Sequence, residues 1–297
     1  MSYDHPEARW GEESASWIAW VVTLAFGGLL TLISFIQQFY EPAPYGRAVA
    51  NDAPTPKKWG PPIPARIAHM LADGIGGFTC FTITFFVFAD TYRLIPFYSL
   101  ADNLKEEISV PNVIGYVMWA AHYVHRGFIT PFFMRFSSKS VPLFVDVGFV
   151  EWEHVFRTFL ANAVISYSIA SFVGAATYPL DYDKDPRFII GIILYVIGYV
   201  VNKWADVHLR NLRKAGETSG YVIPTGFLFD YIVCPNYFGE TLEWTGFLLL
   251  TWTWGALVWL LFCLSTFIPR AIYNKRWYLE KFPEYPKERK LLIPFIF

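Results

Sequence analysis

Residues 16–37 read SWIAWVVTLAFGGLLTLISFIQ, a run of 22 residues without a charged side chain. As a helix, such a run crosses a hydrocarbon core of about 30 Å. The whole chain agrees, because 54% of its 297 residues are hydrophobic, only 16% are charged and the mean hydropathy is +0.32. A soluble domain averages roughly 25% charged residues. We therefore predict a polytopic, all-α membrane protein.

Further apolar stretches predict the other membrane helices, with Pro-rich or charged connectors between them. They are Ile67–Ala89, Val113–Met134, Phe159–Tyr178, Phe188–Val201 with its polar continuation to Asp206, and Leu248–Ile268. The acidic first 15 residues do not resemble a cleavable signal, so we expect the first span to be retained. The connector Glu41–Pro64 holds seven prolines and cannot be a helix. Hydropathy alone thus counts six spans.

The distribution of Lys and Arg requires a seventh crossing. With the N-terminus outside, the odd-numbered connectors hold ten of these residues, the even-numbered connectors four and the tail seven. Because cytoplasmic loops are rich in Lys and Arg, the odd connectors and the tail should share one side, which six spans forbid. A crossing through the polar stretch Gly226–Phe247 restores the parity. Such a broken segment is tolerated only where it lines a cavity, so we predict a buried site near residues 235–243.

Several classes of site are disfavoured by composition and spacing. The formal net charge of −1 gives no general attraction to nucleic acid. The three cysteines lie in or beside apolar stretches without metal-ligand spacing, so we expect neither a disulfide framework nor a zinc site. The glycines of the segment Gly74–Gly77 lack a preceding strand, so they indicate close helix packing and not a phosphate loop.

Ionisable groups within apolar spans indicate functional sites, because they are costly in a membrane. In the third span, His122, His125 and Arg126 have helical spacing for one face, while Tyr123 is turned about 100° from His122. Interhelical hydrogen bonding, metal binding and a catalytic or cofactor site are the alternatives. No cysteine or well-placed carboxylate completes a metal set. The full group of such residues is Asp73, His122, His125, Arg126, Glu240 and Glu243.

Two polar stripes mark the C-terminal half. The first leaves the fifth span, and its members fall within about 80° of one another on a helix: Asn202, Asp206, Arg210 and Arg213. Its cations suit a phosphorylated ligand, although a solvated face with lipid-anchoring cations is the alternative. The second stripe repeats the pattern with Asn236, Glu240 and Glu243, in the additional crossing predicted through Gly226–Phe247.

At these residues the chain resembles the steroid 5α-reductase family, including its plant members that act on brassinosteroid precursors. The resemblance covers most of the chain from Ala43 onward. It is strongest in five motifs: APYGR at 43–47, NKWADVHLRNLRKAG at 202–216, GYVIP at 220–224, CPNYFGETLEW at 234–244, and WYLEKFPEYPKERK at 277–290, followed by LIPFIF at 292–297.

The resemblance implies a seven-helix membrane enzyme that reduces the Δ4 double bond of a 3-oxosteroid with NADPH, which binds among the C-terminal helices. The catalytic tyrosine of the family matches Tyr123, and its glutamate partner matches Asp73, which is one methylene shorter. The cofactor positions match Tyr45, Arg47, Asn202, Asp206, Arg213, Asn236, Glu240, Arg270 and Tyr278.

The chemistry of an enone fits these residues independently. Hydride addition at its β-carbon moves negative charge onto the carbonyl oxygen, which a positioned donor such as Tyr123 stabilises. Asp73 could hydrogen-bond the same oxygen as a protonated acid, or it could orient Tyr123. The sequence leaves both roles open and identifies no proton donor for the α-carbon.

We therefore predict an NADPH-dependent 3-oxo-Δ4-steroid 5α-reductase that acts as a monomer on a steroid or other lipid enone. Residues 1–297 would form one membrane-embedded domain, with substrate-side helices in 1–139 and NADPH-binding helices and the tail in 140–297. The C-terminus would be cytoplasmic, in the endoplasmic reticulum of a eukaryote or the inner membrane of a bacterium. The alternatives are a trans-2-enoyl-CoA reductase, an isoprenylcysteine-type methyltransferase and a non-enzymatic lipid-binding protein.

Overall fold

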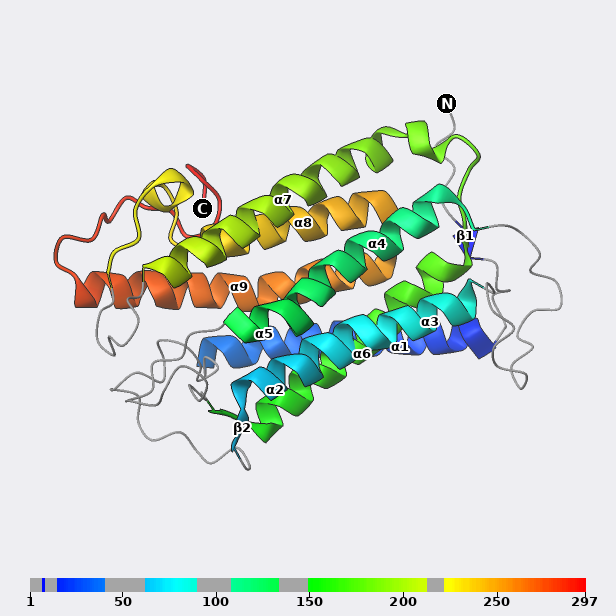
Figure 1. Cartoon of the computed structure of the whole chain (residues 1–297), viewed down its shortest axis with the longest axis horizontal. Coiled ribbons are helices and arrows are strands. Elements are labelled where there is room, and N and C mark those ends of the chain that lie inside the picture. Colours follow the sequence, from blue (N-terminus) through cyan, green and yellow to red (C-terminus); the bar gives the residue numbers. More distant parts are fainter. Residues whose placement is uncertain (1–6, 9–14, 41–61, 90–107, 134–148, 213–221) are drawn as a thin grey trace.

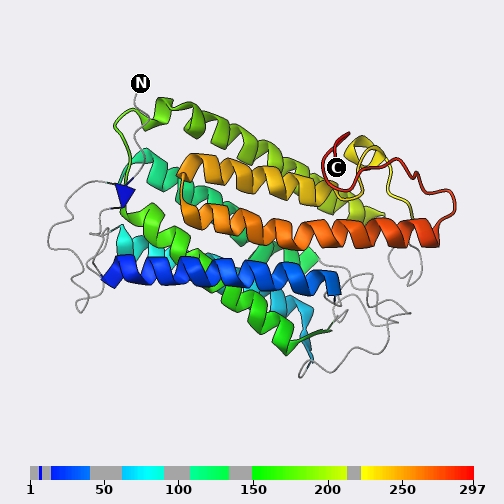
Figure 2. The same cartoon turned by 180° about the vertical axis from the view of Figure 1, so that it is seen from behind.

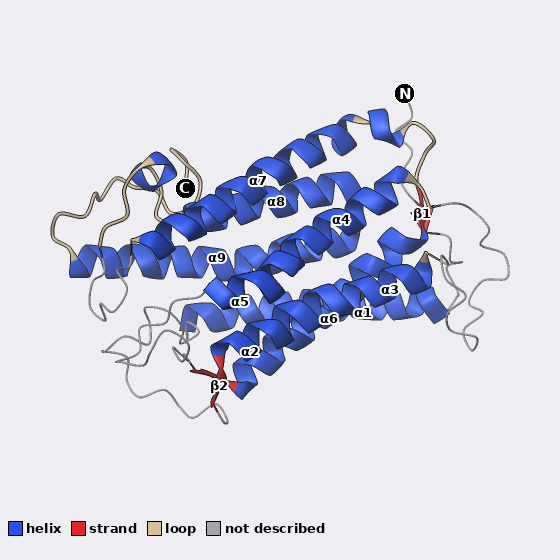
Figure 3. Cartoon of the chain, viewed as in Figure 1, coloured by secondary structure: helices blue, strands red, loops and turns tan. Residues whose placement is uncertain are grey.

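The computed structural model describes residues 7–8, 15–40, 62–89, 108–133, 149–212 and 222–297, and these residues are mostly helical (Figure 3). The long single helices are α1 (Ala15–Tyr40), α6 (Trp152–Ala175), α7 (Pro186–Asn211), α8 (Pro235–Thr251) and α9 (Trp254–Lys281). Two further rods are composite. One joins α2 (Ala65–His69), the π-helix η2 (Met70–Thr79) and α3 (Cys80–Phe88), and the other joins α4 (Val110–Val124), the π-helix η3 (His125–Ile129) and α5 (Thr130–Phe133).

The helices form one bundle with an apolar exterior. Among the described residues, five helices are long and apolar enough to cross a bilayer: Ala15–Phe39, Arg66–Phe88, Thr158–Ala175, Pro186–Asn211 and Trp254–Lys281. The prediction of an all-α membrane protein is thereby confirmed. Successive rods run in alternating directions, so the beginning of α1 and the end of α9 lie at opposite ends of the bundle (Figure 1). Seen from behind, α1 lies along the outer face beside α9 and α6 (Figure 2).

The prediction of one uninterrupted span over Leu248–Ile268 is wrong. The stretch up to Thr251 belongs to α8, which ends where Trp252 adopts a left-handed conformation with a φ of 48°. Thr253 then caps α9 by accepting a hydrogen bond from the Gly255 amide at 3.3 Å. Residues 251–254 contain neither Gly nor Pro, so the hydropathy of the sequence does not reveal this turn. The helix α9 continues through the buried Pro269 to Lys281, well beyond the predicted end.

Local sequence explains where several helices begin. Ser109 and Asn112 form a capping box at the start of α4. At α7, the Asp185 side chain accepts a hydrogen bond from the Arg187 amide at 2.7 Å, and Pro186 occupies the first turn. Two short antiparallel pairs, β1 (Glu7–Ala8) with β4 (Ala176–Thr177) and β2 (Pro62–Pro64) with β3 (Phe149–Glu151), join segments at the helix ends.

Glycines bring the helices of the site into backbone contact. A Cβ atom added to Gly198 of α7 would lie 2.3 Å from the Glu243 amide nitrogen of α8, and one added to Gly127 would lie 2.4 Å from the Gly74 Cα atom. The predicted packing role of the segment Gly74–Gly77 is confirmed. The two π-helices therefore cross in direct contact, which places the side chains on either side of Gly74 and Gly127 close together.

Candidate active site

Tyr123 and Asp73 lie on neighbouring rods and are joined through Asn162 of α6. The Tyr123 hydroxyl donates to the Asn162 Oδ1 atom at 3.3 Å, and the Asn162 Nδ2 atom donates to the Asp73 Oδ1 atom at 3.0 Å and to the Ala72 carbonyl oxygen at 2.8 Å. All three side chains are buried, with relative exposures of 1%, 3% and 6% for Tyr123, Asn162 and Asp73. The two residues expected to act on one substrate oxygen thus belong to one hydrogen-bonded unit.

Aromatic packing fixes the Tyr123 ring at this place. The ring stacks on Trp119 of the preceding helical turn, with centroids 4.9 Å apart, and approaches Trp244 and Trp259 at 6.2 Å. On its other side, a Cβ atom added to Gly77 would lie 2.1 Å from two ring carbons. The glycine is therefore what allows the ring to lie against η2.

Asp73 faces donors at both carboxylate oxygens. Its Oδ2 atom lies 3.1 Å from the His69 Nδ1 atom and 3.3 Å from the Arg126 Nε atom, while its Oδ1 atom accepts from Asn162. A carboxylate with three such neighbours is stabilised in its ionised form. This environment favours the interpretation in which Asp73 orients its neighbours over the one in which it is a protonated donor.

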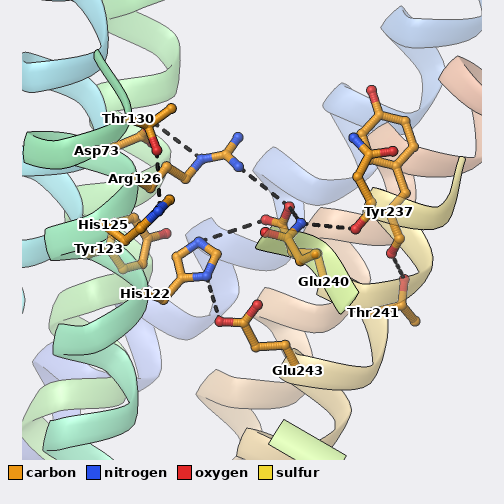
Figure 4. Close-up of polar contacts among 12 residues, drawn as sticks. Asp73, His122, Tyr123, His125, Arg126, Thr130, Tyr237, Glu240, Thr241 and Glu243 are labelled. Atoms are coloured by element: carbon orange, nitrogen blue, oxygen red, sulfur yellow. Dashed lines mark hydrogen bonds and ion pairs between the residues drawn. The ribbon is translucent and has the colours of Figure 1, made fainter. Parts of the chain in front are cut away.

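Arg126 connects Asp73 to the second polar stripe. Its Nη1 atom lies 3.4 Å from the Glu240 Oε2 atom of α8, so one guanidinium bridges carboxylates from two rods (Figure 4). The Arg126 side chain is 39% exposed, whereas both carboxylates are buried. The site therefore contains a continuous charged path from Asp73 through Arg126 to Glu240.

His122 contacts the two buried glutamates of α8, whereas His125 has other partners. The His122 Nδ1 atom lies 2.7 Å from the Glu243 Oε1 atom, and its Nε2 atom lies 3.8 Å from the Glu240 Oε1 atom, with all three residues buried (Figure 4). His125 instead pairs with the Thr130 hydroxyl at 3.1 Å and packs edge-on against Tyr199 of α7. The two histidines thus contact different helices, His122 on α8 and His125 on α7.

Three of the predicted cofactor residues meet between α7 and α8. The Asn202 Nδ2 atom donates to the Asn236 carbonyl oxygen at 2.9 Å and to the Glu240 Oε2 atom at 3.5 Å. Asp206 lies one turn further along α7 than Asn202. The buried Oδ1 atom of Asn202 has no hydrogen-bond partner in the part of the chain that the structure describes. Such an atom suits a polar ligand, because an unpaired buried acceptor is costly.

The other predicted cofactor residues are placed less directly. Tyr278 of α9 packs beside Cys234, the residue before α8, and stacks on Tyr285 at 4.8 Å; Arg270 precedes Ala271 of the same cluster. Tyr45, Arg47 and Arg213 lie outside the described residues. Among the residues that are described, no group of three or more metal-ligating side chains occurs, and none of the three cysteines forms a disulfide.

Asn162 is the site residue that sequence reasoning missed. It lies in the predicted span Phe159–Tyr178, where a single amide among apolar residues carries no spacing signal. The available clue was its cost, because an amide buried in an apolar helix requires partners.

Known proteins of one family are similar to this chain. Residues 151–297 match the family described as 3-oxo-5-alpha-steroid 4-dehydrogenase. The chain is 40% identical over 204 residues to 3-oxo-5-alpha-steroid 4-dehydrogenase 1 of Macaca fascicularis, covering 68% of this chain and 74% of the relative. It is 32% identical over 284 residues to steroid 5-alpha-reductase DET2 of Arabidopsis thaliana, covering 93% of this chain and 95% of the relative.

Proposed function

The chain belongs to the steroid 5α-reductase family, and from this membership we propose that it uses NADPH to reduce the Δ4 double bond of 3-oxo-Δ4-steroids. It is an oxidoreductase of steroid metabolism, as its relatives are named. The observation that carries the catalytic assignment is the buried chain from Tyr123 through Asn162 to Asp73. A phenol held in this way is a preorganised donor in an apolar site.

Tyr123 would stabilise the charge that develops during the reduction. As the bond order of the enone shifts, negative charge accumulates on the 3-oxo oxygen, and a hydrogen bond to that oxygen strengthens in the transition state. The Tyr123 hydroxyl is the donor suited to this role, because its ring is fixed by Trp119 on one side and η2 on the other. A rigid ring needs little reorganisation when the charge appears.

Asp73 would act through the orientation of its neighbours. Its three donors support an ionised carboxylate, and an ionised carboxylate cannot donate to the substrate oxygen. Its negative charge instead holds Arg126 and the Asn162 amide in place. The departure from the glutamate of the family therefore shortens the side chain without removing an acceptor.

The residues between α7 and α8 fit a dinucleotide cofactor. Asn202, Asn236 and Glu240 form one polar cluster with Asp206 one turn further along α7, and the unpaired Oδ1 atom of Asn202 is available to a ligand. Arg213 and Arg270 are the cations suited to a 2′-phosphate, since Arg can bind phosphate in a bidentate manner. When bound, NADPH supplies the hydride for the β-carbon. Glu240, through Arg126, connects its site to Asp73.

The same proposal includes seven crossings and a cytoplasmic C-terminus. The alternating direction of the seven rods supports an odd number of crossings (Figure 1), and the Lys and Arg distribution supports the orientation. We also propose that the active form is a monomer. Reporter tags should place the two termini on opposite sides of the membrane, and tags on the same side would contradict the topology.

The decisive experiment follows NADPH consumption by the purified protein with matched substrates. Androst-4-ene-3,17-dione should be reduced to the 5α product. A trans-2-enoyl-CoA should not be consumed, and S-adenosylmethionine with a prenylcysteine should give no methyl ester. Turnover of the enoyl-CoA alone, or methyl transfer alone, would replace the proposal with the corresponding activity. No turnover of any substrate would leave a lipid-binding protein as the better account.

A further inference from the structure

We propose that Asn162 of α6 is a positioning residue that holds Tyr123 and Asp73 in register for the reduction. This inference rests on the proposed function, in which Tyr123 is the donor to the substrate oxygen. Asn162 is 3% exposed and bonds to both residues and to the backbone of η2. Among the described side chains, Asn162 thus joins α6 to the rod of Tyr123 and to the rod of Asp73.

The orientation of the Asn162 amide follows from its partners. The Ala72 carbonyl oxygen can only accept a hydrogen bond, so the atom 2.8 Å from it must be the Nδ2 donor. The second hydrogen of Nδ2 then points to the Asp73 Oδ1 atom, and the Oδ1 atom of Asn162 is left to accept from Tyr123. If the amide were flipped, its own acceptor oxygen would lie against two other acceptors, the Ala72 carbonyl oxygen and the Asp73 Oδ1 atom. The Nδ2 donor and the Oδ1 acceptor of Asn162 are therefore both assigned by their partners.

This arrangement sets the direction of the Tyr123 hydroxyl group. In the resting site the hydroxyl hydrogen is committed to Asn162 at 3.3 Å, a long and therefore weak hydrogen bond. A substrate oxygen that accumulates charge is a stronger acceptor than a neutral amide, so the hydroxyl can exchange one partner for the other with a small rotation. Asp73 keeps its own donors during that exchange, because they do not depend on the hydroxyl.

Gly76 provides the space for this contact. A Cβ atom added to Gly76 would lie 3.0 Å from the Phe159 carbonyl oxygen and 3.2 Å from the Asn162 Cβ atom. The helix α6 can therefore approach η2 closely enough for one short amide to reach both Ala72 and Asp73. A longer side chain at position 162 would have no such place.

The neighbouring Ser166 offers a matched control. It lies one turn further along α6, is fully buried and donates to the Gly77 carbonyl oxygen of η2 at 3.2 Å. It thus anchors the same two rods, but it does so through a hydrogen bond to the backbone. Loss of the Ser166 hydroxyl measures what a buried α6–η2 hydrogen bond contributes to the fold without touching the pair.

The test compares Asn162→Ala, Asn162→Asp and Ser166→Ala in the purified protein. We expect Asn162→Ala to lower kcat for androst-4-ene-3,17-dione by about 10- to 100-fold, because a misplaced group costs up to about 10²-fold. The steroid KM and the NADPH Kd should stay within about threefold. Asn162→Asp is nearly isosteric and keeps an acceptor for Tyr123 but loses both donors, so it should also lose kcat. Ser166→Ala should keep the wild-type kcat.

The same Asn162 change in a Tyr123→Phe protein separates a positioning role from general damage to the fold. In Tyr123→Phe, the added change Asn162→Ala should lower the residual kcat by less than about twofold, because the group that Asn162 positions is already absent. Full kcat in both Asn162 variants, or an equal fractional loss in the two backgrounds, would overturn the role of Asn162 alone. A wild-type protein that does not reduce the enone would overturn the proposed function and, with it, this role.

Discussion

The close approach of Gly77 to the Tyr123 ring predicts a large effect for one added methyl group. Gly77 of η2 lies against this ring. In Gly77→Ala the new Cβ atom would lie 2.1 Å from the Cδ1 and Cε1 atoms of Tyr123. Nonbonded carbon atoms approach to about 3.5 Å, so the ring or η2 must move by more than about 1 Å. The ring cannot move freely, because Trp119 stacks on it at 4.9 Å.

Two measurable quantities follow from that displacement. Overpacking of a buried site costs about 1–3 kcal/mol of stability, and a displacement of about 1 Å at a reacting group lowers kcat by about 10²-fold. We therefore expect Gly77→Ala to fold with a lower Tm, to bind NADPH as the wild type does, and to reduce androst-4-ene-3,17-dione about 10²-fold more slowly. The assays are thermal unfolding in detergent, NADPH fluorescence and steroid turnover.

The matched control for this prediction is Gly255→Ala at the start of α9. Its added carbon would lie 2.9 Å from the Ile169 Cγ1 atom, so it introduces a smaller overlap in the core, away from Tyr123. Gly255→Ala should lower Tm while keeping kcat. If Gly77→Ala is folded, binds NADPH and turns over at the wild-type rate, the position of the Tyr123 ring does not limit the reaction and the reasoning fails.

Three further predictions concern charge. Arg213→Ala should reduce the preference for NADPH over NADH, as measured by the ratio of the two kcat/KM values, because a cation for the 2′-phosphate is lost; equal use of both cofactors by the wild type would contradict the assignment. Asp73→Asn should retain more activity than Asp73→Leu in steroid turnover, since the amide can still hydrogen-bond, and Asp73→Glu should remain active. Hydrogen bonds from Arg187 hold the pKa of Asp185 below its usual value, so the pair stabilises the fold above the unfolded pKa of about 3.9 and this contribution is lost as the pH falls through the lower folded pKa. Asp185→Asn keeps a cap and should lower Tm at pH 7 but not near pH 2, and an equal loss at both pH values would contradict this origin.

The sequence was sufficient for features that depend on composition or helical spacing. Apolar runs identified the membrane helices, and the turn of about 100° between adjacent residues correctly separated Tyr123 from His122. These two side chains now point to Asn162 and to Glu243, on different rods. The polar spacing also singled out Asn202, Asn236 and Glu240, which the structure brings into contact between α7 and α8.

Features that depend on tertiary contacts were beyond that reasoning. The turn at Trp252 is made by an apolar residue in a left-handed conformation, for which the sequence offers no glycine. The π-helical turns η2 and η3 depart from the spacing of a regular helix, and the sequence did not show that His122 would contact α8 and His125 would contact α7. Asn162 acquires its role only when α6 packs on η2, and a lone amide in an apolar span does not reveal its partners.

The central claim is that the Tyr123 hydroxyl stabilises charge on the substrate oxygen. Its most direct test is the kcat of Tyr123→Phe at saturating NADPH and androst-4-ene-3,17-dione, together with the NADPH Kd of the same preparation. Loss of an oxyanion donor typically lowers kcat by about 10²–10³-fold, so we predict a loss of that size with unchanged NADPH binding. A variant that binds NADPH normally and reduces the enone at a near wild-type rate would contradict the account.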